Sequence, residues 1–504
     1  MSIATASDFE IAPVPARLLL LPLAAAIACV ALADWLFWDW QTIGVSLALF
    51  LGALGVVAVF INGARAPKNT QIVIGAAFVI GLLAVVEDCS DLSRTVAELA
   101  TALFVIIMTA PEASSWPRNL LEAVTLPFRG PFQLIGDLFG ALRRMKSWTP
   151  NWLGSLVAWI VPLCVFAVFL ALFAQANPLI ENTLMQIDLR AFLNLFNLWR
   201  IAFWLMMACI TWPLIRRRLR RKPVRESEPR AAVATQTSDL DFLLGTRAML
   251  RSLILFNALF ALQSGLDLTY LWGGANLPDG MSHAQYAHRG AYPLIATALL
   301  AAGFVLIAMR PGGPSQQSRL IRPLVLLWVG QNILLVISSI FRLDLYVAAY
   351  SLTYLRFAAF IWMVLVAIGL VLILIQIELK KSNRWLLSAN AISLVLALYA
   401  CCFINLPYLV ASYNVQHSQE IAGAGPKLDL CYLGSLGPQA EPALRPHLKQ
   451  IPALEHVISR GRNANHRLGY HENWRGWGFR TWRLERYLAN NPYTPPNPDQ
   501  SGKG

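Results

Sequence analysis

The sequence predicts an all-α membrane protein: a polytopic transmembrane helical bundle of about 11 helices with a small, mainly helical C-terminal domain outside the membrane. Composition is the first indication, because 57% of the 504 residues are hydrophobic and only 14% are charged, whereas soluble domains carry about 25% charged residues. The second is a series of apolar runs long enough to cross a bilayer. Since lipid offers no hydrogen bonds to the backbone, such runs must be helical.

The apolar runs set the expected positions of the spanning helices. We expect helices at about 17–34, 43–62, 71–87, 94–111, 152–176, 192–215, 242–264, 289–309, 322–341, 354–378 and 385–405. The first run ends in an aromatic cluster, "DWLFWDW", which is typical of a membrane–water interface.

Basic residues predict how the helices are threaded. With the N-terminus in the cytoplasm, the inner segments hold 22 Lys and Arg, and the outer loops hold four: Arg94, Arg190, Arg289 and Arg342. Cytoplasmic loops carry such an excess. The net charge of +13 therefore reflects orientation, and no nucleic-acid partner is expected. No basic region precedes the first apolar run, so we expect no cleaved signal peptide.

Seven segments follow from this threading. They are four helices (1–112), a cytoplasmic amphipathic interfacial segment (113–151), helices five and six (152–215), a basic cytoplasmic linker (216–241), a five-helix membrane domain (242–405), an extracytoplasmic domain (406–491) and a disordered tail (492–504). Pro127 and Pro131 interrupt the interfacial segment, which predicts one or two helices on the membrane surface. The expected location is the bacterial inner membrane, with a cytoplasmic N-terminus and a periplasmic C-terminus.

Cysteine and histidine spacing indicates neither a metal nor a cofactor. Five of the seven cysteines lie in apolar runs, where cysteine behaves as a small hydrophobe. Only Cys89 and Cys431 lie in polar segments, so one disulfide between them is conceivable. All seven histidines fall on the expected outer side, but only His283 and His288 are close in sequence. We therefore expect no metal site.

Several motifs in the second half occur in a recognisable order. These are "RSLILFNALFALQSGLDLTYLWGG", "SHAQYAHRGAY", "RLDLYVAAYSLTYLR", "ASYNVQHSQ" and "LDLCYLGSLGPQAEPAL". They resemble the bacterial multi-pass membrane family catalogued as domain of unknown function 4173, over about 240–450. The chain departs from that family's pattern at Ala291, which separates Arg-Gly from the aromatic Tyr292. The resemblance implies no activity, substrate or cofactor.

A carboxylate near the end of an apolar helix is costly unless it has a partner. Asp267 is such a residue, and Arg289 is the expected partner. An outward-facing polar site is predicted from Asp267, Tyr270, Tyr286, His288, Arg289, Tyr350 and Arg356. Tyrosines at 346, 350 and 354 recur every four residues and share one helical face. The alternatives are an interfacial tyrosine belt and an arginine that extends to the headgroups.

Two further groups of residues suggest other roles. Asp34 and Asp39, in the first outer loop, are the acids that a multi-pass glycosyltransferase would use, although acids at helix ends are also common caps. The tail segment "NWRGWGFRTWRLERYL" is expected to contact lipid through Trp474, Arg475, Trp477, Arg480, Trp482 and Arg483. A helix that simply packs on the membrane domain would explain the same pattern.

The function expected from these residues is that of an integral membrane protein that binds an anionic lipid or envelope component at the outward-facing site, for transport, assembly or sensing. Membrane lipids and an anionic lipid or envelope glycan are the expected partners. A non-catalytic scaffold is the first alternative and a glycosyltransferase-like enzyme the second. The balance of the sequence favours a protein that is not an enzyme.

Overall fold

The computed structural model describes residues 17–38, 43–110, 115–145, 197–217, 246–269, 320–459 and 474–492, with a few isolated positions between them. All regular structure in these ranges is helical, which confirms the predicted all-α class. The chain forms two compact units: residues 1–221 with 469–479, and residues 222–468 with 480–504.

Nine helices in the described ranges are long and apolar enough to cross a membrane. Their apolar segments are Leu20–Phe37, Val45–Asn62, Lys68–Glu87, Asp91–Thr109, Leu198–Ile215, Met249–Asp267, Ile321–Tyr350, Tyr354–Glu378 and Asn383–Phe403. They agree with nine of the predicted runs. The runs at 152–176 and 289–309 fall mostly outside the described residues. The chain is therefore a multi-pass membrane protein.

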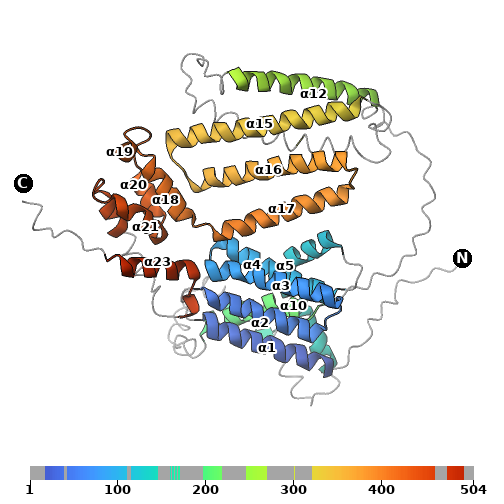
Figure 1. The fold of residues 1–504 in the computed structure, drawn as a ribbon. Helices are drawn as coiled ribbons and strands as arrows, with labels where there is room; N and C mark the ends of the chain where they lie inside the picture. The colour runs from blue at the N-terminus through green and yellow to red at the C-terminus, as the bar shows by residue number, and fades with distance from the viewer. Residues whose placement is uncertain are drawn as a thin grey trace, which may run out of the picture. The chain divides into compact units, whose positions relative to one another are not determined.

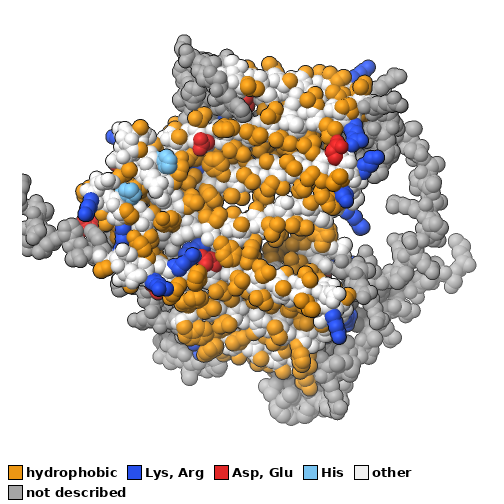
Figure 2. All heavy atoms as spheres, viewed as in Figure 1, with side chains coloured by type: hydrophobic (Ala, Val, Ile, Leu, Met, Phe, Trp, Pro, Cys, Tyr) orange, Lys and Arg blue, Asp and Glu red, His pale blue; other side chains and the backbone are white. Residues whose placement is uncertain are grey.

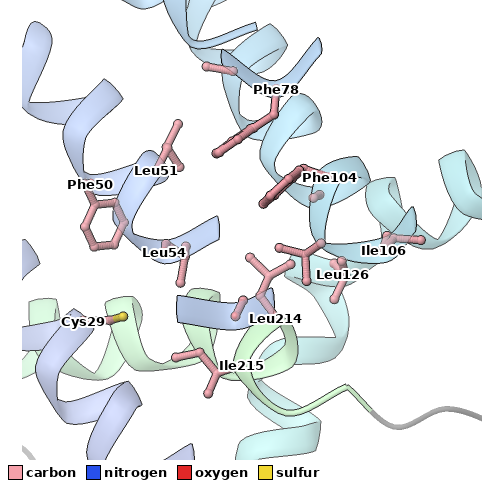
Figure 3. Packing of buried hydrophobic residues seen from close by; sticks show 14 of the residues in the cluster. Cys29, Phe50, Leu51, Leu54, Phe78, Phe104, Ile106, Leu126, Leu214 and Ile215 are labelled. Carbon is pink, nitrogen blue, oxygen red and sulfur yellow. The ribbon is translucent and has the colours of Figure 1, made fainter. Parts of the chain in front are cut away.

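The first unit is a helical bundle around one apolar core (Figure 1). It contains α1 (Arg17–Phe37), α2 (Val45–Asn62), α3 (Lys68–Glu87), α4 (Asp91–Thr109), α5 (Trp116–Met145) and α10 (Leu198–Ile215). Leu54, Ile106 and Ile215 are among its largest fully buried side chains. Figure 3 shows them with the stacked rings of Phe78 and Phe104, whose centroids are 4.2 Å apart. Each spanning helix thus buries one stripe against its neighbours.

Helix α5 corrects the expectation that Pro127 and Pro131 interrupt the interfacial segment. The helix runs unbroken from Trp116 to Met145 through both prolines. A proline removes one backbone donor and crowds the preceding turn, but packing of a buried face outweighs that local cost here. Ala123 and Leu126 on this face belong to the core of the unit.

The second unit places four long helices one beside the next (Figure 1). They are α12 (Thr246–Asp267), α15 (Ile321–Tyr350), α16 (Tyr354–Glu378) and α17 (Asn383–Phe403). Thr353 and Ser382 cap α16 and α17, because each side chain accepts a backbone N–H of the first turn. Figure 2 shows hydrophobic side chains along the flanks of α15–α17 and Lys or Arg near helix ends, as expected for helices surrounded by lipid.

Short helices follow α17 and enclose a separate apolar cluster. They are α18 (Leu406–Gln416), α19 (Gln419–Ala422), α20 (Leu430–Ser435), η2 (Pro438–Ala440), α21 (Glu441–Leu444) and η3 (Arg445–His447); η4 (Trp474–Gly476) and α23 (Phe479–Asn490) come later. Val410, Leu433 and Leu454 are fully buried in the cluster. Asn414 in α18 binds the α15–α16 turn, accepting from Leu352 N at 2.6 Å and donating to Leu352 O at 2.9 Å. The cluster therefore lies at the end of the bundle where α15 ends.

That contact makes the threading testable by thiol labelling. Cys431 is exposed and lies on the side where α15 ends, so a membrane-impermeant maleimide is expected to label it from outside intact cells. A Lys222→Cys variant made in a Cys431→Ser background should be labelled only after permeabilisation. Cys89 is a poorer reporter, because burial raises the pKa of its thiol and leaves less reactive thiolate. A Cys431→Ser variant is the control, and labelling of positions 222 and 431 from the same side would contradict the predicted topology.

Candidate functional site

A buried ion pair joins α12 to α15. The Arg342 guanidinium contacts the Asp267 carboxylate, and each of these residues is only 3% exposed. Ser338 Oγ donates to Asp267 Oδ2 at 2.5 Å, and Gln263 Nε2 donates to Asp267 Oδ1 at 3.0 Å. A carboxylate at the end of an apolar helix requires such donors, because neither charge can be left alone in a medium of low dielectric. We call these four residues the Asp267 cluster.

The polar face of α15 continues from this cluster toward the helix end. Arg342, Tyr346 and Tyr350 follow at intervals of four residues and therefore share a face. The rings of Tyr346 and Tyr350 lie 4.8 Å apart. Arg356 Cζ, from the first turn of α16, lies 4.6 Å from the centre of the Tyr346 ring and 6.0 Å from that of Tyr350. This geometry suits a cation–π contact. We call Tyr346, Tyr350 and Arg356 the tyrosine–arginine site.

A tight turn brings Arg356 back over the end of α15. Ser351 has a positive φ of 68° and ends the helix. Nη1 of Arg356 donates to Tyr350 O at 2.5 Å and to Ser351 O. These carbonyls have no partner within α15, so the cation caps the negative end of that helix. The structural role of Arg356 thus uses one of its nitrogen atoms.

Four of the predicted site residues lie outside the described residues. These are Tyr270, Tyr286, His288 and Arg289. Asp267 has the kind of partner that was expected of it, and that partner is Arg342. The pairing of Asp267 with Arg289 stays a prediction. Tyr350 and Arg356 are brought together at the end of α15.

Asp34 is tied to α10 instead of lying in an open outer loop. It belongs to the last turn of α1. Its Oδ1 accepts from Arg200 Nε at 2.9 Å and from Trp204 Nε1 at 2.8 Å, while its Oδ2 accepts from Arg200 Nη2 at 2.5 Å. The Arg200 guanidinium also lies 5.5 Å from the Trp38 ring. Both carboxylate oxygens of Asp34 accept hydrogen bonds from α10, so this residue joins α1 to α10. Asp39 lies outside the described residues.

The tail residues predicted to contact lipid divide into exposed and buried ones. Trp474, Trp477 and Trp482 are exposed, as is Arg483. Arg480 is buried, contrary to the expectation that it contacts lipid, and its Nη2 donates to Cys402 O at 2.7 Å. That carbonyl is in the last turn of α17, where a cation is favourable.

Arg475 lies at the end of α1 within the first unit. Its guanidinium carbon lies 5.1 Å from the Trp35 ring and 6.0 Å from the Trp474 ring. Nearby, Val45 N donates to Trp477 O at 2.8 Å. Alanine at Gly44 would place its Cβ 2.4 Å from that same oxygen, so the tail approaches the start of α2 closely only because residue 44 is glycine.

A polar network at the other end of the first unit was not anticipated from the sequence. Arg216 contacts Asp137 at 2.8 Å, and Arg217 contacts Glu122 at 2.7 Å. Asn62 accepts from Arg217 N at 3.1 Å and donates to Leu214 O at 2.9 Å. The sequence assigns these arginines only to a charged linker. The acids of an amphipathic segment next to such a linker were the available signal for these pairs.

Both units together define a class: a multi-pass α-helical membrane protein in which charged pairs link the ends of apolar helices. The family model described as Domain of unknown function (DUF4153) matches residues 73–447, and the chain belongs to that family. The family number 4173 expected from the motifs is therefore wrong. The matched region also begins at residue 73, far before the segment at about 240–450 that carried the resemblance. No curated protein and no solved structure matches the chain.

Proposed function

We propose that this integral membrane protein binds the anionic group of a lipid or envelope component at the tyrosine–arginine site, for transport, assembly or sensing. The observation that carries the proposal is that only one nitrogen atom of the Arg356 guanidinium donates hydrogen bonds to described residues. Nη1 is used in the cap of α15. Among the described residues, Nε and Nη2 of Arg356 have no hydrogen-bond acceptor, so a planar pair of donors remains for a ligand.

The surroundings of Arg356 favour an anionic ligand held at an interface. Arg356 is half-buried and Tyr350 is 50% exposed, so a ligand from outside the helix bundle can reach both. A guanidinium presents parallel N–H donors that match two oxygens of a phosphate or carboxylate. Tyrosine suits a membrane interface because its ring is apolar and its hydroxyl is polar. The Asp267 cluster would hold the adjoining face of α15 in place.

Lipid titration of purified protein tests this proposal. In detergent, native mass spectrometry with added phosphatidylglycerol should detect bound lipid, and Arg356→Ala should lower the affinity by about 10-fold or more. The magnitude follows from the loss of charge-assisted hydrogen bonds worth about 1.5–3 kcal/mol. Phosphatidylcholine should bind the two proteins equally, because it lacks the net negative charge.

Two comparisons separate binding from helix capping. Arg356→Lys keeps the charge and one donor for the α15 carbonyls but removes the planar fork, so it should retain stability and lose most of the lipid affinity. Arg384→Ala removes an exposed arginine from the start of α17 and should leave binding unchanged. Equal phosphatidylglycerol affinity in the native protein and in Arg356→Ala would exclude the site.

A non-catalytic membrane scaffold is the second candidate function. It is favoured by ion pairs between segments far apart in the sequence. Asp34 with Arg200 and Asp267 with Arg342 each join two helices, and Asp137 with Arg216 and Glu122 with Arg217 join α5 to the residues that follow α10. Charges used in this way stabilise a bundle and leave few groups for chemistry. On this view Arg356 is only a helix cap, so Arg356→Ala would lower stability without changing lipid binding.

A further inference from the structure

Helix α5 crosses the ends of two spanning helices instead of running alongside them. Glu122 and Asp137 are about four helical turns apart, yet they contact the adjacent residues Arg217 and Arg216 that follow α10. If α5 and α10 packed side by side, residues about four turns apart on α5 would contact residues that are also several turns apart on α10. The same Arg217 also donates to Ile106 O, in the last turn of α4, at 2.7 Å. Helix α5 therefore lies across the membrane boundary at which α4 and α10 end.

One face of α5 is buried in the first unit. Its buried positions recur at intervals of three, four and seven residues and are Asn119, Ala123, Leu126, Gly130 and Asp137. Gln133, between them, donates to Arg216 O at 2.6 Å. Trp212 Nε1 in α10 donates to Asp137 Oδ2 at 3.0 Å. These contacts fix the rotation of α5 about its axis and so determine which residues face outward.

The opposite face of α5 is apolar and exposed. It carries a stripe of large side chains with the same helical spacing: Leu121, Val124, Phe128, Phe132, Ile135 and Phe139. Phe128 is 75% exposed and Phe132 is 80% exposed. A stripe of this size is unfavourable in water. Because α5 lies at the level where spanning helices end, lipid is the solvent adjacent to it.

Basic residues lie on one flank of the stripe. Arg118 and Arg129 are both exposed and are about three turns apart on the same side of α5. In the described part of the chain neither takes part in an ion pair. Arginines beside an apolar stripe are typical of helices that lie in the plane of an anionic membrane surface.

We infer that α5 is an interfacial helix that inserts its outer stripe among the acyl chains of one leaflet and binds anionic phospholipid headgroups through Arg118 and Arg129. The ends of α4 and α10 identify this leaflet, which the distribution of basic residues predicts to be cytoplasmic. The lipid contact is therefore distinct from the tyrosine–arginine site, which is expected on the opposite side. It also gives α5 a role besides that of a connection between spanning helices.

Photocrosslinking in bilayers tests the inference. The photoreactive residue p-benzoylphenylalanine is placed at Phe132 of the full chain, which is reconstituted into vesicles of phosphatidylcholine and phosphatidylglycerol at a ratio of about 3:1. Irradiation should yield lipid adducts by mass spectrometry. The control carries the same residue at Lys449, which is exposed in the segment that is expected outside the membrane. Its lipid adduct should be at least about 10-fold weaker.

The headgroup preference is measured from the same adducts. Phosphatidylglycerol should be enriched over its share of the vesicle in the protein labelled at Phe132, and the Arg118→Gln, Arg129→Gln double variant should reduce that enrichment to the bulk ratio. Unchanged enrichment in the double variant would exclude headgroup binding by these arginines. Crosslinks from Phe132 to a second copy, or equal lipid adducts at Phe132 and Lys449, would contradict insertion of the stripe into the membrane.

Discussion

Replacing Arg342 by alanine is expected to destabilise the second unit by about 3–5 kcal/mol, because it leaves the Asp267 carboxylate buried without its cation. For domains of this size that corresponds to a fall of about 6–20 °C in the melting temperature. Thermal unfolding of the purified protein in detergent, followed by size-exclusion chromatography of the soluble fraction, measures this shift. The loss should be among the largest for a single substitution in this unit, since both side chains are almost fully buried.

Two variants compare the stability contributed by the buried Asp267–Arg342 pair with that of an exposed ion pair. Arg322→Ala breaks a pair with Glu378 whose side chains are 43% and 59% exposed and 3.5 Å apart, so it should cost no more than about 1 kcal/mol. The Asp267→Asn, Arg342→Gln double variant removes both charges and should recover much of the stability lost in Arg342→Ala. If Arg342→Ala and Arg322→Ala melt at the same temperature, the Asp267 cluster does not lock the bundle.

The nine described spans were predictable because hydropathy and the sidedness of basic residues are local properties of the sequence. The partner of a charged side chain is not a local property of the sequence, because it can come from a distant helix. Asp267 was expected to need a cation, but α15 was expected to end at about 341, which placed Arg342 in a loop. In the structure α15 continues to Tyr350 because Asp267, from another helix, neutralises Arg342. The same applies to Arg200, which lies within an apolar run and is balanced by Asp34 of α1.

Amphipathic patterns in the sequence identified polar and apolar faces but not what covers them. Arg480 lies in a tail segment that resembles a lipid-binding helix, yet its guanidinium is buried against the end of α17. Pro127 and Pro131 are local signals for a break, and packing of α5 against α10 overrides them. Of the predicted polar site, Arg356 lies within its predicted helix, whereas Tyr350 lies beyond the expected end of α15 at about 341. The expectation that Tyr346, Tyr350 and Tyr354 share one helical face is wrong, because α15 ends at Tyr350 and α16 begins at Tyr354. The sequence does not indicate Tyr346 as a site residue, because only the turn between these helices brings Arg356 over its ring.

Gly130 is predicted to be the most sensitive position of α5 because a backbone atom of α10 occupies the space of a side chain there. Pro213 in α10 has no N–H, so the carbonyl of Cys209, four residues earlier, has no helical donor. Helix α5 approaches that carbonyl closely: a Cβ at Gly130 would lie 2.0 Å from Cys209 O. Neither main chain can move without shifting a whole helix. Gly130→Ala should therefore destabilise the first unit by about 1–3 kcal/mol, even though alanine favours helices by about 1 kcal/mol.

The same helix supplies matched controls for this substitution. Gly136 and Gly140 have no neighbour within 4 Å of an added Cβ, so Gly136→Ala and Gly140→Ala should raise stability by up to about 1 kcal/mol through helix propensity. Thermal unfolding in detergent should thus give opposite signs for three identical substitutions in one helix. The close approach also fixes where α5 crosses α10, so Gly130→Ala should weaken lipid adducts from Phe132 in bilayers. A stabilised Gly130→Ala variant would show that α5 does not contact Cys209 in the membrane.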